Sequence, residues 1–509
     1  DQYFLNYGCE PHELRWYPLH SSRCERKQMS IRARGMLRQS LRPDRIAHLF
    51  WGDAMQDHNS DAMNAQEKRA ASGLSLVFAF RMLGMFMVLP VLATYGQDLA
   101  GATPFLLGLA IGAYGLTQAV LQIPFGMLSD RFGRLPIIYI GLLIFAAGSV
   151  VAGMSDSVWG VISGRVLQGA GAISAAVMAL LSDLTREQHR TKAMAMIGIS
   201  IGISFAVAMV VGPLVTRGFG LSGLFWFTAA MALVGMVIIA ITVPKPAQQV
   251  VTRESGVAKT ALAATLRNPD LLRLDLGIFV LHALLMASFV ALPLALVEQG
   301  GLPKEEHWWV YLIALFVGFF AMLPFIIYSE KKRQMKRVFV GAVGVLMGTE
   351  LFLWLFADSL TLLIIGTLAF FTAFNFLEAS LPSLISKVSP AGAKGTAMGV
   401  YSTSQFLGAA LGGMLGGWLF TVGGASLVFA GCAALAALWL IFAANMQEPP
   451  YVTSVRLSVS PAAMQDTQWL IALSAQAGVV DTILVAEEAA VYVKFDTQII
   501  DRASVESYL

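Results

Sequence analysis

A short loop at residues 126–134, with two glycines, one aspartate and two arginines, separates two apolar stretches of the chain. It reads Gly-Met-Leu-Ser-Asp-Arg-Phe-Gly-Arg. Asp130 and Arg134 are four residues apart at a helix end, a spacing that brings their charges together. Gly126 permits close packing and Gly133 permits a tight turn. We predict an ordered loop built around an ion pair; the alternative is an ordinary basic loop between membrane helices.

Two arginines lie inside apolar stretches. Arg81 stands about ten residues into the first stretch, roughly 15 Å deep at 1.5 Å per residue, which is too deep to reach the membrane surface easily. Arg165 is about seven residues from a helix end, so its side chain either reaches the surface or faces the interior. An arginine inside a membrane span is a candidate for binding the solute or for taking part in proton transfer.

Acids and a histidine in the later stretches are candidates for carrying a proton. Glu378 is the best candidate, because an acid in mid-membrane is costly unless it is paired or functional. Asn375 lies three residues away on the same helical face. His282 is either a proton carrier, since its ordinary pKa is near neutrality, or a hydrogen-bonded packing residue. Neutral side chains that could contact a solute, or simply bond between helices, are Tyr114, Gln118, Gln122, Tyr401, Ser404 and Gln405.

The elements that must position these residues are apolar stretches long enough to cross a bilayer. The 509-residue chain is 56% hydrophobic and 13% charged, whereas soluble proteins average about 25% charged residues. Stretches of about 20 residues recur from residue 72 onward, the length that spans a hydrocarbon core of about 30 Å. The predicted helices are 72–95, 105–128, 135–154, 158–183, 192–216, 222–243, 271–297, 307–328, 338–356, 359–386, 395–420 and 424–445. The predicted fold class is an all-α polytopic membrane protein.

The distribution of lysine and arginine predicts the orientation in the membrane. One set of loops carries most of these residues, whereas the opposite set carries little beyond Arg217 and Lys304. The basic set is expected to face the cytoplasm. Both termini and the linker at 244–270 then face the cytoplasm, which agrees with an even number of spans.

The N-terminal 66 residues differ from the membrane region. They are polar and irregular, and the first residue is Asp1. We interpret residues 1–66 as an extension that is disordered or not native, with Met55 or Met63 as a natural start.

The C-terminal residues 447–509 predict a small α+β domain. Apolar and polar residues alternate in short runs, in the order β-α-β-β, and a second helix begins at Arg502. This order fits a ferredoxin-like domain. We expect it to regulate the membrane part or to bind a partner, docking on the basic linker through Glu487 and Glu488; the alternative is a stabilising appendage.

Composition and spacing exclude several functional classes. The three cysteines, Cys9, Cys24 and Cys432, build neither a disulfide framework nor a metal site, and residues 447–509 contain no cysteine or histidine to bind copper. The chain has no GxxxxGK[ST] motif for ATP-driven pumping. Its net charge of +3 gives no reason to expect nucleic acid. We predict a protein that is not an enzyme and needs no cofactor or metal.

The motifs together resemble those of the major facilitator superfamily. The loop at 126–134 resembles the signature loop of that family at six positions: Gly126, Leu128, Asp130, Arg131, Gly133 and Arg134. Residues 164–171, which include Arg165, resemble the fourth-helix motif of the family, and Asp183 falls where the family places an acid beside the signature loop. The glycine-rich motif of drug exporters is only partial here, because Leu214 and Val215 follow Gly212-Pro213. The resemblance covers about residues 63–509.

The resemblance implies two six-helix bundles, at 67–243 and 271–446, that tilt about a central site in a bacterial inner membrane. A conformational latch is implied for Gly126, Asp130, Arg131, Gly133, Arg134 and Asp183. The Asp130 carboxylate would face the helix N-terminus near Gly395, where free amides carry partial positive charge. The residues implied to line the proton and solute cavity are Arg81, Tyr114, Gln118, Gln122, Arg165, His282, Asn375, Glu378, Tyr401 and Gln405. Glu350 is also in mid-membrane, but its helix is peripheral in this family.

The leading hypothesis is a monomeric, proton-coupled secondary transporter that exports a small solute. A second hypothesis keeps the carrier but makes it an importer by proton symport. A third is a membrane sensor, in which the helices bind a ligand and the C-terminal domain reports it.

Overall fold

The computed structural model describes residues 63–244, 257–389, 394–449, 451–460, 463–464, 468–485, 489–496 and 498–508. The extension predicted at 1–66 therefore lies outside the described residues up to residue 62. Glu487 and Glu488 lie outside them as well.

The N-terminal half begins earlier than predicted. Its elements are α3 (Ala65–Phe86), α4 (Leu89–Tyr95), the short η1 (Gly96–Asp98), α5 (Pro104–Phe132), α6 (Arg134–Gly153), α7 (Val158–Ala170), α8 (Ser174–Asp183) and α9 (Glu187–Thr242). Helix α3 starts at Ala65, and Glu67 in its first turn is only 2% exposed and accepts a 2.9 Å hydrogen bond from Nε of Arg186.

The C-terminal half repeats this arrangement. Its elements are α10 (Val257–Arg267), α11 (Pro269–Glu298), η2 (Lys304–Glu306), α12 (His307–Lys331), α13 (Met335–Phe356), α14 (Leu360–Val388) and α15 (Lys394–Ala444). Helix α10 occupies part of the predicted linker. Capping residues begin several helices in both halves, since their side-chain oxygens accept hydrogen bonds from first-turn amides; these are Thr103, Ser157, Asn268 and Ser359.

The predicted all-α polytopic fold is confirmed. Ten segments of the described chain are long and apolar enough to cross a membrane. Two of them, with 51 and 50 residues, would extend about 75 Å as straight helices, far beyond a core of about 30 Å. They are broken at Gly220 and at Gly423–Gly424, where positive φ angles of 71° and 66° suit glycine. Each therefore supplies two spans, and the twelve predicted spans are accounted for.

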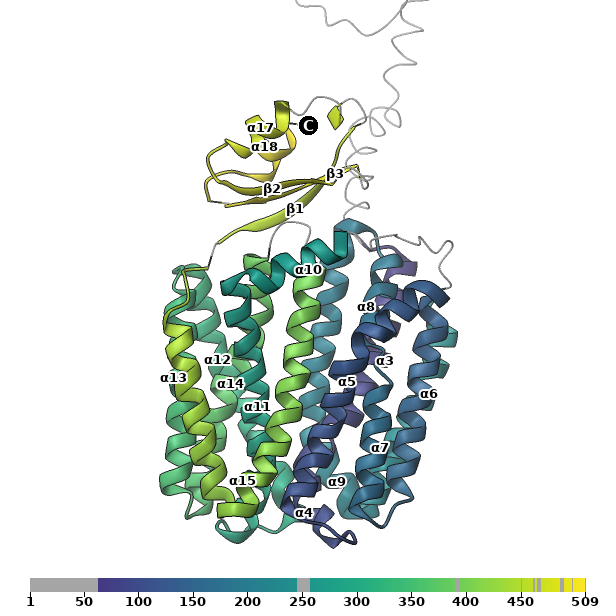
Figure 1. Ribbon diagram of the computed structural model, residues 1–509, viewed down its shortest axis with the longest axis vertical. Helices are drawn as coiled ribbons and strands as arrows, with labels where there is room; N and C mark the ends of the chain where they lie inside the picture. The colour runs from purple at the N-terminus through teal and green to yellow at the C-terminus, as the bar shows by residue number, and fades with distance from the viewer. Residues whose placement is uncertain are drawn as a thin grey trace, which may run out of the picture. The chain divides into compact units, whose positions relative to one another are not determined.

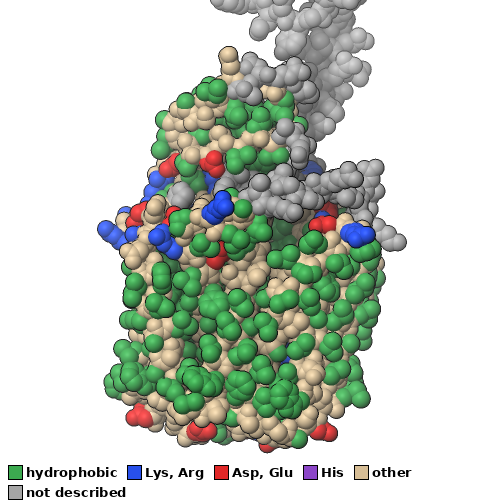
Figure 2. All heavy atoms as spheres, in the orientation of Figure 1, with side chains coloured by type: hydrophobic (Ala, Val, Ile, Leu, Met, Phe, Trp, Pro, Cys, Tyr) green, Lys and Arg blue, Asp and Glu red, His purple; other side chains and the backbone are tan. Residues whose placement is uncertain are grey.

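The flank of the bundle is apolar and its two ends are charged. Hydrophobic side chains cover the face shown in Figure 2, and exposed ones elsewhere on the described chain include Val120, Phe316 and Ile441. We call one end the basic end, because Arg134, Arg186 and Lys332 lie where α6, α9 and α12 begin or finish. The end that contains Gly220 and Gly423 is the opposite end.

Helix α5 of the N-terminal half lies directly against α15 of the C-terminal half (Figure 1). A Cβ atom added to Gly413 would stand 2.8 Å from the carbonyl oxygen of Gly108 and 2.9 Å from the amide nitrogen of Gly112. The two backbones therefore touch near the opposite end. Toward the basic end of α15, a Cβ atom on Gly395 or Gly399 would meet no described atom within 4 Å. The halves are closed at the opposite end and diverge toward the basic end.

A charged contact strengthens the same closure. Nζ of Lys304, in η2 of the C-terminal half, lies 3.8 Å from the Asp98 carboxylate in η1 of the N-terminal half. It also lies 4.3 Å from the centre of the Tyr95 ring. Both contacts join the two halves at the opposite end.

Gly413→Ala should open the opposite end. The added methyl group has no room against the α5 backbone, and overpacking of this kind costs about 1–3 kcal/mol. Double electron–electron resonance would measure the separation of the halves. The spin labels are placed on Asp156→Cys and Glu306→Cys in a background without the native cysteines. We expect a longer distance in Gly413→Ala and an unchanged one in the matched control Gly399→Ala. Equal distances in both variants would contradict the packing argument.

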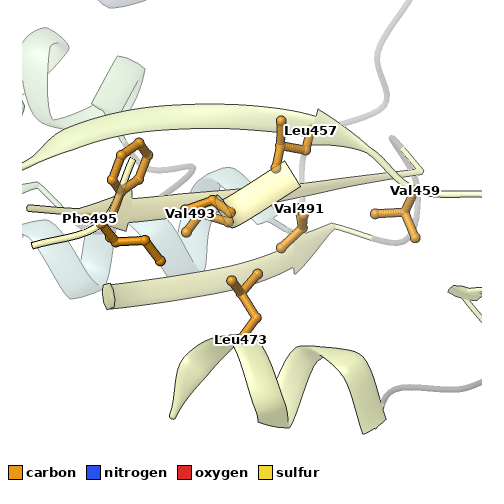
Figure 3. Close-up of a cluster of buried hydrophobic side chains, with 8 residues drawn as sticks. Leu457, Val459, Leu473, Val491, Val493 and Phe495 are labelled. Carbon is orange, nitrogen blue, oxygen red and sulfur yellow. The ribbon is translucent and has the colours of Figure 1, made fainter. Parts of the chain in front are cut away.

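The C-terminal domain is a three-stranded antiparallel sheet with two helices. Its elements are β1 (Thr453–Ser458), α17 (Gln468–Ser474), β2 (Val479–Val485), β3 (Ala490–Phe495) and α18 (Arg502–Glu506), and the sheet order is β1-β3-β2. Val493 pairs with Val455 on one side and Thr482 on the other. The core is formed by one face of β3 with Leu457 and Leu473 (Figure 3). The predicted β-α-β-β order and the helix at Arg502 are confirmed.

Described contacts attach this domain to loops of the C-terminal half. Arg333 donates hydrogen bonds of 2.9 and 2.7 Å to the two carboxylate oxygens of Asp496. Lys494 donates to the carbonyl oxygens of Lys387, at 3.1 Å, and of Ser389, at the end of α14. These contacts involve other residues than the predicted Glu487 and Glu488.

The Arg333–Asp496 contact should be insensitive to pH near neutrality. Hydrogen bonds from Arg333 hold the pKa of the Asp496 carboxyl below its ordinary value of 3.8. A depressed folded pKa means that the contact contributes fully above pH 3.8 and is lost as the pH falls through the lower folded value. Spin labels on Val480→Cys and Val345→Cys should report one distance between about pH 5 and 8. Arg333→Gln should broaden that distribution, and the exposed control Arg337→Gln should not; identical distributions would contradict the contact.

Candidate functional site

The glycine-rich loop brings three charged groups together at the basic end. Gly133, with a φ of 100°, ends α5 and turns the chain so that Arg134 begins α6. The guanidinium of Arg134 donates to the carboxylates of Asp130 and Asp183, the latter at 3.3 Å, and to the Ser129 hydroxyl at 2.9 Å. Asp130 and Arg134, four residues apart, therefore form one ion cluster with Asp183 that joins α5, α6 and α8.

The other loop residues surround this cluster. A Cβ atom on Gly126 would lie 3.4 Å from that of Ala175 on α8, so the helices pack closely there. Arg131 stacks on Phe132, 5.3 Å from the ring centre. The Asp130 side chain is 61% exposed, and Arg134 is its one bonded partner among the described residues. The role of these residues as a latch stays a prediction.

Arg81 crosslinks the core of the N-terminal half. Its side chain is only 1% exposed and donates to the Gln118 amide oxygen, to the Gly171 carbonyl oxygen at 3.1 Å and to the Ser174 hydroxyl at 3.3 Å. The fourth span is interrupted between α7 and α8, which frees the Gly171 carbonyl from helical bonding. The amide of Gln118 also lies 3.4 Å from Gln122. The interrupted fourth span thus provides part of the buried environment of Arg81.

Arg165 also faces the interior, and the alternative that it reaches the membrane surface is wrong. It is 1% exposed, and its Nε and Nη1 donate to Ala110 O at 3.3 Å and to Gln168 Oε1 at 2.9 Å. Its guanidinium lies 4.8 Å from the centre of the Tyr114 ring. Arg81 lies 5.9 Å from the same ring. Tyr114 is therefore common to both arginines.

Three helices of the C-terminal half bring a histidine, an acid and an amide together. His282 comes from α11, Glu378 from α14 and Gln405 from α15. Nε2 of Gln405 lies 3.3 Å from Oε1 of Glu378 and 2.9 Å from Nε2 of His282. Nδ1 of His282 lies 3.9 Å from Oε2 of Glu378. We call these three residues the acid–imidazole cluster.

Other predicted residues lie beside or away from this cluster. Tyr401 is buried, its hydroxyl has no hydrogen-bond partner among the described residues, and it interacts electrostatically with Glu378. Asn375 instead approaches Gly318 of α12, with its Nδ2 3.4 Å from a Cβ placed there. Glu350 is fully buried and accepts a 3.0 Å hydrogen bond from Ser288.

Asp275 was missed in the sequence. It is 5% exposed, seven residues before His282 on α11, and within the described chain neither of its carboxylate oxygens has a hydrogen-bond partner. It also interacts electrostatically with Tyr401. The sequence does place this acid inside the predicted span 271–297. Acids are common near helix N-termini, however, because they interact favourably with the helix dipole, so Asp275 did not stand out.

An aromatic contact joins the two halves beside the acid–imidazole cluster. The ring of Phe205 on α9 lies 6.1 Å from those of Phe371 and Phe374 on α14. Phe374 in turn lies 6.0 Å from the His282 ring. A rearrangement of the halves would therefore alter the surroundings of His282.

Comparisons with known proteins agree with this architecture. The Major Facilitator Superfamily model matches residues 74–412 and 336–480, and the YajR YAM domain model matches 455–509. The chain is 53% identical over 448 residues to the inner membrane transport protein YajR of Escherichia coli (strain K12), covering 88% of this chain and 98% of that protein. It is 25% identical over 344 residues to the multidrug resistance protein MdtH of Yersinia pestis (strain Pestoides F), covering 67% and 84%.

A solved structure shares the fold. The crystal structure of a bacterial homolog to the human lysosomal transporter Spinster, in an inward-facing and occupied conformation, matches with a TM-score of 0.60 at 15% identity. The match covers 76% of this chain and 98% of that one. From the family match, the relatives and the fold, the chain belongs to the major facilitator superfamily of membrane transporters, resembles YajR over most of its length, and carries a C-terminal domain of the YajR YAM type.

Proposed function

We propose that the protein is a proton-coupled secondary transporter that exports a small solute across the bacterial inner membrane by alternating access. The acid–imidazole cluster is the observation that carries this proposal. Glu378 is held by a neutral amide and an imidazole, with no arginine or lysine paired to it in the described chain. A carboxylate in such surroundings is costly to ionise, so its protonation depends strongly on whether water reaches it.

The contacts between the halves support alternating access. The α5–α15 backbone contact and the Lys304–Asp98 contact close the opposite end, while Gly395 and Gly399 are free of close neighbours at the basic end. If the basic end faces the cytoplasm, as the positive-inside rule predicts, this arrangement is open inward. Asp130 is then exposed because the latch is disengaged.

The name of one relative bears on the direction of transport. A relative at 25% identity is named a multidrug resistance protein, which favours export. Import by proton symport and ligand sensing without transport remain the competing proposals. Proton antiport moves solute and protons in opposite directions, symport moves them together, and a sensor shows ligand binding without flux.

Glu378→Gln should uncouple transport from the proton gradient. The amide keeps a hydrogen bond to Gln405 but carries no titratable proton. In proteoliposomes, a screen for solute flux driven by a pH gradient should identify a substrate for the wild type. We expect gradient-driven flux of that substrate to fall at least about tenfold in the variant, because loss of a proton-transfer group typically costs a hundredfold or more. Solute exchange at equal pH should persist.

Glu350→Gln is the matched control, since Glu350 is also an acid inside a membrane span, but it is fully buried and bonds Ser288 away from the cluster. Its gradient-driven flux should stay near the wild-type level. Gradient-driven flux that survives in Glu378→Gln, or that is absent from the wild type for every solute screened, would refute the proton-coupled assignment.

Asp130→Asn should favour the state that is open at the basic end. The carboxylate stabilises the closed state by facing the N-terminus of α15, and such an interaction is worth about 0.3–1 kcal/mol. A cysteine at Gly399, in a background without the native cysteines, would report opening by its rate of labelling with an impermeant maleimide. We expect labelling about two to five times faster in Asp130→Asn.

The control for this variant is Asp270→Asn, which removes a carboxylate that pairs with Arg273 at the same end. It should leave the labelling rate unchanged. Equal labelling and equal transport in Asp130→Asn and the wild type would rule out the latch.

A further inference from the structure

Two buried guanidinium groups face one tyrosine in the N-terminal half. Arg81 and Arg165 are each 1% exposed, and they lie 5.9 and 4.8 Å from the centre of the Tyr114 ring. They come from α3 and α7, and the ring comes from α5. Two like charges therefore lie beside one aromatic ring inside a membrane-spanning bundle.

Every hydrogen-bond acceptor that the described chain gives these arginines is neutral. The acceptors are carbonyl, amide and hydroxyl oxygens of Ala110, Gln118, Gln168, Gly171 and Ser174. Other arginines of the described chain do pair with acids, as Arg134 and Arg333 show. An intramembrane positive charge without a counter-charge is costly. The two arginines thus lack the partner that would normally offset their burial.

Donor groups at this place are unused. Nε of Arg81 and the hydroxyl of Tyr114 are buried without a hydrogen-bond partner among the described residues. Buried polar groups without partners are rare in folded proteins, and a missing ligand is one explanation. A guanidinium with a free N–H and a nearby hydroxyl is suited to bind an oxyanion.

Apart from Glu67, which pairs with Arg186 at the basic end, the acids inside the described membrane spans lie in the other half. Asp275, Glu350 and Glu378 belong to α11, α13 and α14. Glu378 is engaged by His282 and Gln405, and Glu350 by Ser288, so neither neutralises the arginines in this structure. Arg81 and Arg165 therefore lie inside the N-terminal half, whereas Asp275, Glu350 and Glu378 lie inside the C-terminal half.

We propose that the transported solute is an organic anion whose carboxylate binds at Arg81 Nε and the Tyr114 hydroxyl. Arg165 adds a second positive charge beside the Tyr114 ring. This inference rests on the proposed transport function and names the substrate class of its central site.

The test uses three probes of equal size and different charge: benzoate, benzamide and benzylammonium. Each is titrated into the purified full-length protein, and saturable quenching of tryptophan fluorescence gives its dissociation constant. We expect the wild type to bind benzoate and to bind neither the neutral nor the cationic probe measurably. Arg81→Gln should weaken benzoate binding at least about tenfold, since it removes a charge-assisted hydrogen bond. Arg81→Lys, which keeps the charge, should lose less.

Arg273→Gln is the control, because it removes one positive charge at the basic end, where Asp270 pairs with it. Its benzoate affinity should match the wild type. The thermal unfolding midpoint of each variant separates misfolding from a lost contact, and Tyr114→Phe gives a second variant if Arg81→Gln fails to fold. Benzoate binding that is absent from the wild type, or equal in the wild type and folded Arg81→Gln, would overturn the proposal, as would preference for benzylammonium.

Flux measurements separate this inference from the proposed function. Arg81-dependent benzoate binding without transport of any solute would support the anion site and refute the carrier. Proton-coupled flux of benzylammonium alone would support the carrier and refute the anion site.

Discussion

The direct backbone contact between α5 and α15 determines how the two halves of this transporter meet. Glycines on both helices remove the side chains that would hold the backbones apart, so Gly413 approaches Gly108 and Gly112 as closely as two main chains can. Toward the basic end the surroundings of Gly395 are open, and Asp130 is exposed at the same end.

The low dielectric constant of the membrane interior explains how the polar side chains of the spans are arranged. Water is scarce there, so each polar side chain must be satisfied by protein or by a ligand. Arg81 is partly satisfied because the fourth span is interrupted and offers the Gly171 carbonyl. Glu378 is partly satisfied because Gln405 and His282 reach it from two other helices.

The sequence predicted features that depend on local spacing or on the thickness of the bilayer. The twelve spans follow from hydrophobic length, and the Asp130–Arg134 pair follows from a four-residue spacing with a glycine turn. The break between α7 and α8, the position of Asn375 beside Gly318 of α12, and the partners of Arg165 were not predictable, because they depend on which neighbouring helix packs against each face. Asp275 was missed because burial near a helix N-terminus depends on tertiary contacts.

Several described contacts of the C-terminal domain involve the C-terminal half. Lys494 binds carbonyl groups at the end of α14, Arg333 precedes α13, and Tyr451 accepts a hydrogen bond from the Met335 amide at the start of α13. If the two halves tilt as proposed, a domain held in this way would move with the C-terminal half, and its position would follow the transport cycle.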